Sequence, residues 1–196
     1  MKQQTKVVLS PKEREMVTDA GLILTKNAII GKVYAVFGML SDEYSLLLGQ
    51  FPQLSEDAGP RSPKISKGEQ YEGLPWVMLD HPRHYRGDDA FGIRSFFWWG
   101  NYCSITLQLS GTFQQKYAPI LHQNLAGSKD WFIGINDDRW QHHFRPDNYK
   151  PYAEWNGDLG SLPFIKLAKK IPLTEWDQLD QFFTCNYAQL LQALSC

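Results

Sequence analysis

The sequence is poor in the residues and motifs that mark several protein classes. Its 196 residues include only three cysteines, Cys103, Cys185 and Cys196, and none stands in a C-x-x-C spacing. The usual thiolate metal sites and dithiol redox motifs are therefore excluded, and such a sparse, odd set predicts reduced thiols in a cytoplasmic protein. No Walker loop, G-x-G-x-x-G, G-x-S-x-G or kinase signature occurs either, so the common nucleotide-binding and hydrolase motifs are absent.

An excess of charge of either sign is also missing. Twenty basic residues nearly balance 21 acidic ones, which leaves a formal net charge of −1. Proteins that hold nucleic acid or an anionic membrane by electrostatics usually carry a clear basic excess, so neither partner is indicated. The most apolar stretch, residues 20–40, contains Lys26 and Lys32. Charges inside a membrane span are costly, so we expect a buried helix there and no membrane anchor.

Helical patterns are strongest towards the two ends of the chain. Ser10, Pro11 and Glu13 form a helix start, because serine caps, proline suits the first turn and glutamate can close a capping box. We predict helix from there to about residue 48, with a break near residues 19–21. A second long helix is predicted after Thr174, since its apolar residues recur on one face. These are Trp176, Leu179, Phe183, Tyr187, Leu190 and Leu194.

The middle of the chain carries strand patterns. Residues 91–99 and 102–109 flank Gly100-Asn101, a dipeptide typical of tight hairpins. In the second run Cys103, Ile105 and Leu107 alternate with polar residues, which predicts a half-buried strand with one wet face. Residues 76–79, 131–135 and 140–144 are further short candidates, and 49–73 is expected to be an irregular long loop.

Together these patterns predict one α+β domain covering residues 1–196. Its antiparallel sheet would have about four to six strands, with the N-terminal and C-terminal helices packed on one side. The chain is unusually aromatic, at 14% Phe, Trp and Tyr. Residues 96–99 put aromatic side chains on both faces of one strand, so one of those faces must be covered by a helix, the long loop, a ligand or a second copy of the chain.

Arg94 stands inside an otherwise apolar strand, on the same face as Trp98. A guanidinium in that position must pair, stack on a ring or reach water. His84 and Arg86 belong to the polar segment that enters the strand. We predict that Arg94, Trp98 and His84 or Arg86 border one cleft for a small flat or anionic ligand. The alternative is that Arg94 pairs with Asp88 or Asp89 on the surface, with Trp98 packed beneath a helix.

Histidines and acids near the same segment are the candidates for a metal site. Imidazole and carboxylate suit zinc, iron or manganese, and His81, His84, Asp88 and Asp137 are the residues of those types that stand out. Their spacing matches no closed metal motif, however. The turn-forming preference of Asn and Asp also explains residues 136–138. No metal site is predicted, and the sequence indicates no particular cofactor.

Three function classes follow. The first is a non-catalytic, soluble cytoplasmic domain that binds a small flat or anionic ligand or a protein partner. The second is a metal-assisted hydrolase that uses His81 and His84 with nearby aspartates. The third is a structural protein that forms homo-oligomers through an exposed aromatic face. No nucleic-acid or membrane partner is expected in any of the three.

Overall fold

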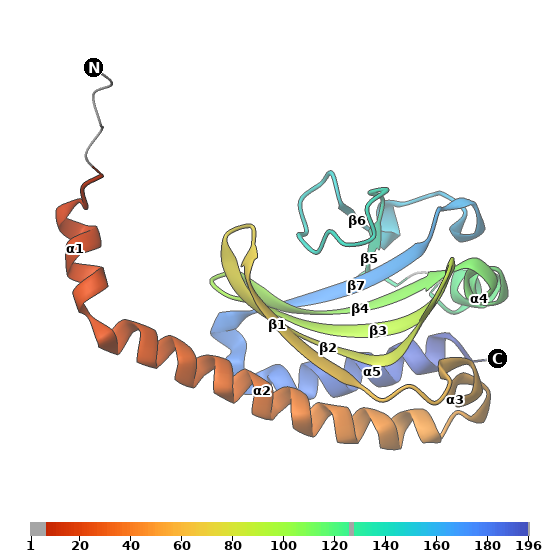
Figure 1. Cartoon of the computed structure of the whole chain (residues 1–196). Coiled ribbons are helices and arrows are strands. Elements are labelled where there is room, and N and C mark those ends of the chain that lie inside the picture. Colours follow the sequence, from red (N-terminus) through yellow and green to blue (C-terminus); the bar gives the residue numbers. More distant parts are fainter. Residues whose placement is uncertain (1–6, 126–127, 196) are drawn as a thin grey trace.

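The computed structural model describes residues 7–125 and 128–195, and a mixed α+β architecture organises them (Figure 1). Seven antiparallel strands form one sheet in the order β1-β2-β3-β4-β7-β5-β6. The strands are β1 (Lys64–Tyr71), β2 (Leu74–Arg86), β3 (Asp89–Trp98), β4 (Tyr102–Ser110), β5 (Phe132–Gly134), β6 (Tyr149–Pro151) and β7 (Ile165–Pro172). The predicted fold class is confirmed, with seven strands in place of four to six.

Five α-helices accompany the sheet. They are α1 (Pro11–Thr18), α2 (Ala20–Gly49), α3 (Pro52–Ala58), α4 (Gly111–Asn124) and α5 (Leu179–Ala193). Short 3-10 turns, η1 (Tyr152–Glu154), η2 (Leu159–Ser161) and η3 (Leu173–Gln178), complete the described elements. Figure 1 shows α2 and α5 running beneath the same side of the sheet, as the sequence predicts. We call this side the inner face and the opposite side the outer face.

The inner face is the main hydrophobic core. Phe91, Ile93 and Phe97 of β3 are buried there against residues from the helices. Tyr44 of α2 stacks on Tyr187 of α5 with ring centroids 3.7 Å apart. Burial of large aromatic and aliphatic side chains of this kind supplies most of the favourable free energy of folding. The two long helices are therefore held to the sheet and to each other.

The predicted helix start and break are both confirmed. Ser10 and Glu13 form the reciprocal capping box, with the Ser10 backbone N–H donating to the Glu13 carboxylate at 2.7 Å. The helix is interrupted at Asp19, which caps α2 through the Gly21 N–H. The expectation that residues 20–40 are buried is wrong for the first third of α2. This part extends beyond the sheet, and its apolar side chains are exposed (Figure 1).

The hairpin at residues 91–109 is also confirmed, because β3 pairs with β4 from Ala90–Ser110 to Trp98–Tyr102. Ile105 and Leu107 face the inner core as predicted. The prediction that the other face of this strand is exposed to solvent is wrong, because Thr106 and Gln108 are only 5% and 3% exposed. Residues 135–148, predicted in part to be an edge strand, instead form an irregular loop over the outer face. We call it the covering loop.

The expected long loop at 49–73 holds two regular elements. Pro52 begins α3, and β1 runs along the edge of the sheet paired only with β2. An edge strand with one exposed side needs little apolar alternation, so its sequence gives a weak signal. Strand β2 likewise continues past Asp80, where the sequence predicted an end, through a register shift before Arg83.

The cysteines divide by environment. Cys103 is buried in the inner core and Cys185 is exposed, and both are free. Burial raises the pKa of the Cys103 thiol to about 12, so it stays protonated and packs as an apolar group. Cys196 lies outside the described residues.

Candidate functional site

The outer face contains a buried ion pair at its centre. Arg94 of β3 and Asp80 of β2 are directly opposite each other in the sheet. The guanidinium donates through Nε to Asp80 Oδ1 at 2.7 Å and through Nη2 to Oδ2 at 3.2 Å. Both residues are less than 10% exposed. Because a buried charge is tolerated only with a close partner, this two-point contact fixes Arg94 in place.

Two groups of the covering loop complete the surroundings of Arg94. Its guanidinium lies 5.5 Å from the centroid of the Trp140 ring. Its Nη1 lies 3.5 Å from His142 Nε2. Burial, followed by the nearby Arg94 charge, holds the pKa of His142 well below its usual range. His142 is therefore neutral at physiological pH, and its ring can accept from Arg94 and pack on Phe96, 4.7 Å away.

The covering loop is fastened to the sheet by hydroxyl groups. The Tyr71 hydroxyl accepts from the backbone N–H groups of His142 and His143 at 2.7 and 3.0 Å. The Tyr102 hydroxyl donates to the His142 carbonyl at 3.1 Å. At the edge, Arg145 forms a two-point contact with Glu72 at 2.6 and 3.0 Å. These bonds satisfy backbone groups that an irregular loop would otherwise leave unpaired.

Lys166 of β7 is a second cation beneath the loop. It is 2% exposed, and its ammonium donates to the Gln141 carbonyl. Burial, with a smaller contribution from Arg94, lowers the pKa of Lys166 to about 7. The neutral form of Lys166 is therefore much more accessible than that of an ordinary lysine, which reduces the cost of burying the side chain.

Two hollows open on the outer face. The first, which we call the Trp76 hollow, has a volume of about 330 Å³. It is lined by Gly68, Glu69, Gln70, Tyr71, Trp76, Met78, Phe96, Trp140 and His142. The second, the Trp98 cleft, measures about 350 Å³. It is lined by Glu72, Leu74, Trp98, Asn101, Tyr102, His143, Phe144, Arg145 and Lys170.

Aromatic rings and a cation meet in the Trp98 cleft. Trp98 and Tyr102 contact edge to face at 5.5 Å, and Phe144 approaches Tyr102 in the same manner at 5.3 Å. The Lys170 ammonium lies 5.0 Å from the Phe144 centroid and 5.6 Å from that of Tyr102. Among the described residues no carboxylate comes within 4.0 Å of Lys170. The cleft therefore combines flat apolar walls with one cation that no acid neutralises.

Two buried polar atoms beside this cleft also have no hydrogen-bond partner within the described chain. The indole Nε1 of Trp98 has no hydrogen-bond partner there, and neither has Nδ1 of His143. Burial first, and then the charge of Arg145, lowers the pKa of His143. Unpaired buried polar atoms are uncommon in folded proteins and often mark a site that a ligand or water completes.

The predicted ligand residues do not come together as expected. Arg94 and Trp98 share the outer face, although Trp98 lines the cleft and Arg94 lies under the covering loop. His84 is on the inner side, where Nδ1 lies 3.0 Å from the Asp57 carbonyl and the ring packs on Phe113. The prediction of a single cleft bounded by Arg94 and His84 is therefore wrong. The register shift in β2 changes which side chains reach each face.

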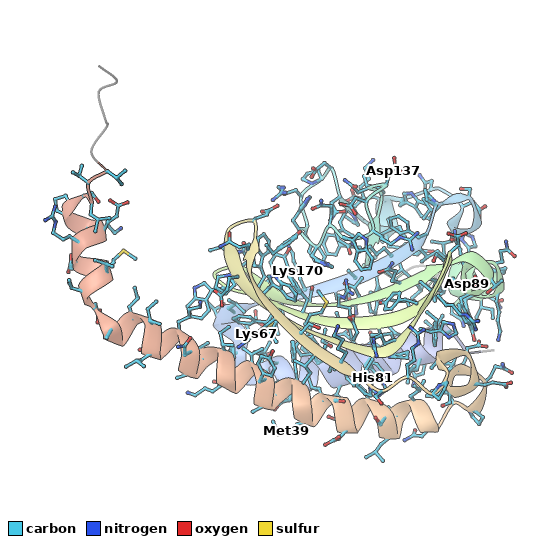
Figure 2. The ribbon with its side chains drawn as sticks, viewed as in Figure 1. Met39, Lys67, His81, Asp89, Asp137 and Lys170 are labelled. Carbon is cyan, nitrogen blue, oxygen red and sulfur yellow. The ribbon has the colours of Figure 1, made fainter. Side chains whose placement is uncertain are left out.

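Arg86 and the metal candidates are also dispersed. Arg86 is exposed at the end of β2. His81 is buried near α2, with Nε2 2.9 Å from the Ser45 hydroxyl, whereas Asp137 lies in the covering loop across the sheet (Figure 2). Asp88 is exposed in the β2–β3 turn. Within residues 7–125 and 128–195, no three His, Cys, Asp or Glu side chains gather into a group that could hold a metal ion.

The sequence did not identify Asp80 as the partner of Arg94, or Lys170 as part of a site. The pairing of Asp80 with Arg94 depends on the β2–β3 register. Lys170 belongs to a small basic cluster that is typical of a solvated surface. One signal was available: an acid on a neighbouring strand is one of the partners that a lone arginine in an apolar strand can take.

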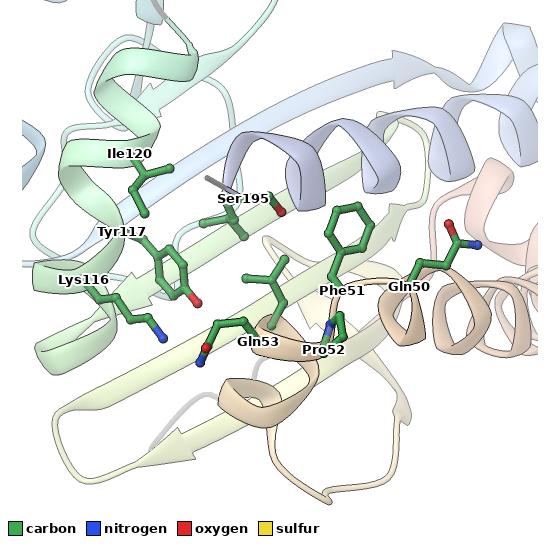
Figure 3. Close-up of a pocket in the computed structure, with 10 residues that line it drawn as sticks. Gln50, Phe51, Pro52, Gln53, Lys116, Tyr117, Ile120 and Ser195 are labelled. Carbon is green, nitrogen blue, oxygen red and sulfur yellow. The ribbon is translucent and has the colours of Figure 1, made fainter.

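A third cavity lies on the helical side of the molecule, between α3, α4 and the end of α5 (Figure 3). Its volume is about 340 Å³, and Phe51, Pro52 and Ile120 make its surface mainly apolar. At its border the Lys116 ammonium donates to Asp57 at 2.6 Å. This cation is already neutralised, so the cavity lacks the free charge of the Trp98 cleft.

Comparison with known proteins adds no assignment. No protein-family model, no curated protein and no solved structure matches this chain.

Proposed function

We propose that this chain is a non-catalytic, soluble cytoplasmic domain that binds a small flat ligand with a negative charge in the Trp98 cleft. One observation carries the proposal. Lys170, exposed and without a carboxylate partner in the described residues, stands beside the rings of Trp98, Tyr102 and Phe144. Ligand sites generally pair apolar walls with a few polar groups that set orientation.

The size and charge of the cleft define the ligand class. A volume of about 350 Å³ is at the small end of ligand sites, so it suits a molecule of one or two rings. Aromatic walls favour a planar group by stacking or edge contact. Lys170 supplies attraction for a carboxylate or phosphate, while Arg145 is already paired with Glu72. The ligand would then lie with its ring on Trp98 and its anion at Lys170.

Binding is favoured over catalysis because the reactive side chains are dispersed. His142 is buried and neutral, and the partners of His81 and His84 are a serine hydroxyl and a backbone carbonyl. General acid–base chemistry needs a titrating group within hydrogen-bond reach of the substrate. The Trp98 cleft offers only His143 among the histidines, and its lowered pKa weakens it as a base.

The test compares an anion with its neutral analogue. Titration calorimetry would measure binding of 1-naphthoate and of 1-naphthalenemethanol, which share the ring system and differ in charge. We expect the anion to bind more tightly and Lys170→Met to remove most of that preference. The expected loss is about fivefold, which corresponds to roughly 1 kcal/mol for a partly exposed ion contact.

A matched control is available on β6, at the edge of the sheet. Lys150 is exposed on β6 and does not line the cleft. Lys150→Met should leave both affinities unchanged while altering the net charge by the same amount. Equal binding of the two probes, or an equal effect of the two substitutions, would contradict the proposal.

A further inference from the structure

Helix α2 has two different long faces. One packs on the sheet through Ile30, Val33, Phe37, Leu40, Tyr44 and Leu48. The opposite face carries six exposed residues, Ala28, Lys32, Ala35, Met39, Asp42 and Leu46. Figure 2 places Met39 on the side of the helix that points away from the sheet, and in Figure 1 the rest of the labelled fold lies on the other side. We call these six exposed residues the α2 seam.

The spacing of the seam is that of a coiled coil. Its residues follow one another at intervals of four, three, four, three and four, which averages 3.5–3.6 residues per turn and keeps them in one narrow stripe. Gly31 and Gly38 flank the stripe, and a Cβ added at either would meet nothing within 4 Å. Glycine is a poor helix former, and neither position needs it within this chain. Both glycines leave room for another helix to approach.

We propose that the α2 seam packs antiparallel on the α2 seam of a second copy of this chain. A two-fold axis between positions 35 and 39 places Ala35 opposite Met39 of the other copy. The same axis places Ala28 opposite Leu46. Each contact then joins a small side chain to a large one, and each occurs twice, as a self-complementary dimer interface requires.

Charge determines the direction of the pairing. The same axis places Lys32 opposite Asp42 of the second copy, so two ion pairs form across the interface. A parallel pair would instead place lysine against lysine and aspartate against aspartate. Neither Lys32 nor Asp42 has an ion-pair partner among the described residues, so both are available. Charged seam positions commonly set orientation in coiled coils.

A lipid surface is the competing occupant of this face. By length and composition alone, α2 could cross a membrane, and only 11% of its most apolar part is buried. Asp42 lies in the middle of the C-terminal half of the seam, however, and an acidic side chain there opposes insertion into an anionic or apolar layer. The opposite charges of the seam favour a second copy.

The experiment is disulfide cross-linking of the full chain with Cys185 and Cys196 replaced by serine. Ala28→Cys and Leu46→Cys would be prepared separately, mixed and oxidised. We expect a covalent dimer in the mixture and little in either variant alone. In the antiparallel pair two copies of residue 28 are 18 positions apart, which is about 27 Å along a helix and far beyond disulfide reach.

Charge exchange gives an independent measurement. In sedimentation equilibrium, Lys32→Glu should weaken the dimer at least tenfold, and adding Asp42→Lys should restore it. Both positions are exposed, so circular dichroism should show unchanged helix content. The proposal is overturned if the unaltered chain is monomeric at about 100 µM, a concentration that corresponds to roughly 5–6 kcal/mol of association free energy. Cross-linking of Ala28→Cys to itself, or binding of the monomer to phosphatidylcholine–phosphatidylserine vesicles, would also overturn it.

Discussion

The inner and outer faces of the sheet use the same strands, yet they are buried by different means. On the inner face, residues such as Ile93 and Leu107 pack against long helices and need no hydrogen bonds. On the outer face, Arg94, Asp80 and Lys166 are buried under an irregular loop, and each depends on particular polar partners. The two faces are therefore stabilised differently. Removal of apolar area from water stabilises the inner face, and hydrogen-bonded buried polar groups stabilise the outer face.

The largest expected effect comes from breaking the outer ion pair. Asp80→Ala leaves the Arg94 charge buried without its partner and should lower the free energy of unfolding by about 3–5 kcal/mol. The double variant Asp80→Leu with Arg94→Met removes both charges and should recover most of that loss. Urea denaturation measures all three. A double variant as unstable as the single one would show that the pair itself, and not an orphaned charge, stabilises the face.

On the inner face, truncation should cost a similar amount for a different reason. Leu107→Ala creates a cavity at a fully buried position and should cost about 2–5 kcal/mol. Gln108 is its neighbour on the outer side, and its amide Nε2 lacks a hydrogen-bond partner in the described residues. Gln108→Ala should therefore cost much less, about 1 kcal/mol. Equal losses in chemical denaturation would mean that the two faces do not differ as described.

The same contrast explains which parts of the fold could be predicted from the sequence. The inner face was predictable from Cys103, Ile105 and Leu107, because apolar alternation is a local property of one strand. The outer face was not, since the polar side chains of Thr106 and Gln108 are buried as well. A polar side chain in a strand carries no sign of whether water or protein covers it.

The candidate site was only partly predictable for a related reason. Arg94 was identified because a charged residue is unusual inside an apolar strand, and Trp98 because it lies on the same face of that strand. The face on which His84 lies depends on the pairing register of β2 beyond Asp80, where the register shifts at a bulge. One such shift reverses the face of every later side chain, so His84 lies on the inner side.

A smaller effect should appear in the pH dependence of stability. The pKa of Lys166 is about 7 in the folded chain and near 10.5 when unfolded. Between these values the unfolded state binds more protons, so stability should rise with pH. Raising the pH from 7 to 9 should therefore stabilise wild type relative to Lys166→Met. The measurement is the difference in their free energies of unfolding. Lys150→Met, which alters an exposed lysine, should follow wild type throughout.

The smallest effect concerns the attachment of the covering loop. Tyr71→Phe removes the hydroxyl that accepts from two backbone N–H groups, and should cost about 1–2 kcal/mol. Amide exchange of His142 and His143 should accelerate more than that of the inner strands. Tyr34→Phe is the control, because no hydrogen bond of its hydroxyl to a described residue is found. An unchanged exchange rate in Tyr71→Phe would mean that other contacts hold the loop.

The most direct measurement of the central claim is amide hydrogen exchange with and without 1-naphthoate. The claim is that the outer face, at the Trp98 cleft, is where this chain binds a ligand. The account predicts slower exchange at residues 143–145 and 101–102, which border the cleft, and no change around residues 116–120. Protection confined to residues 116–120, beside the cavity of the helical side, would contradict it.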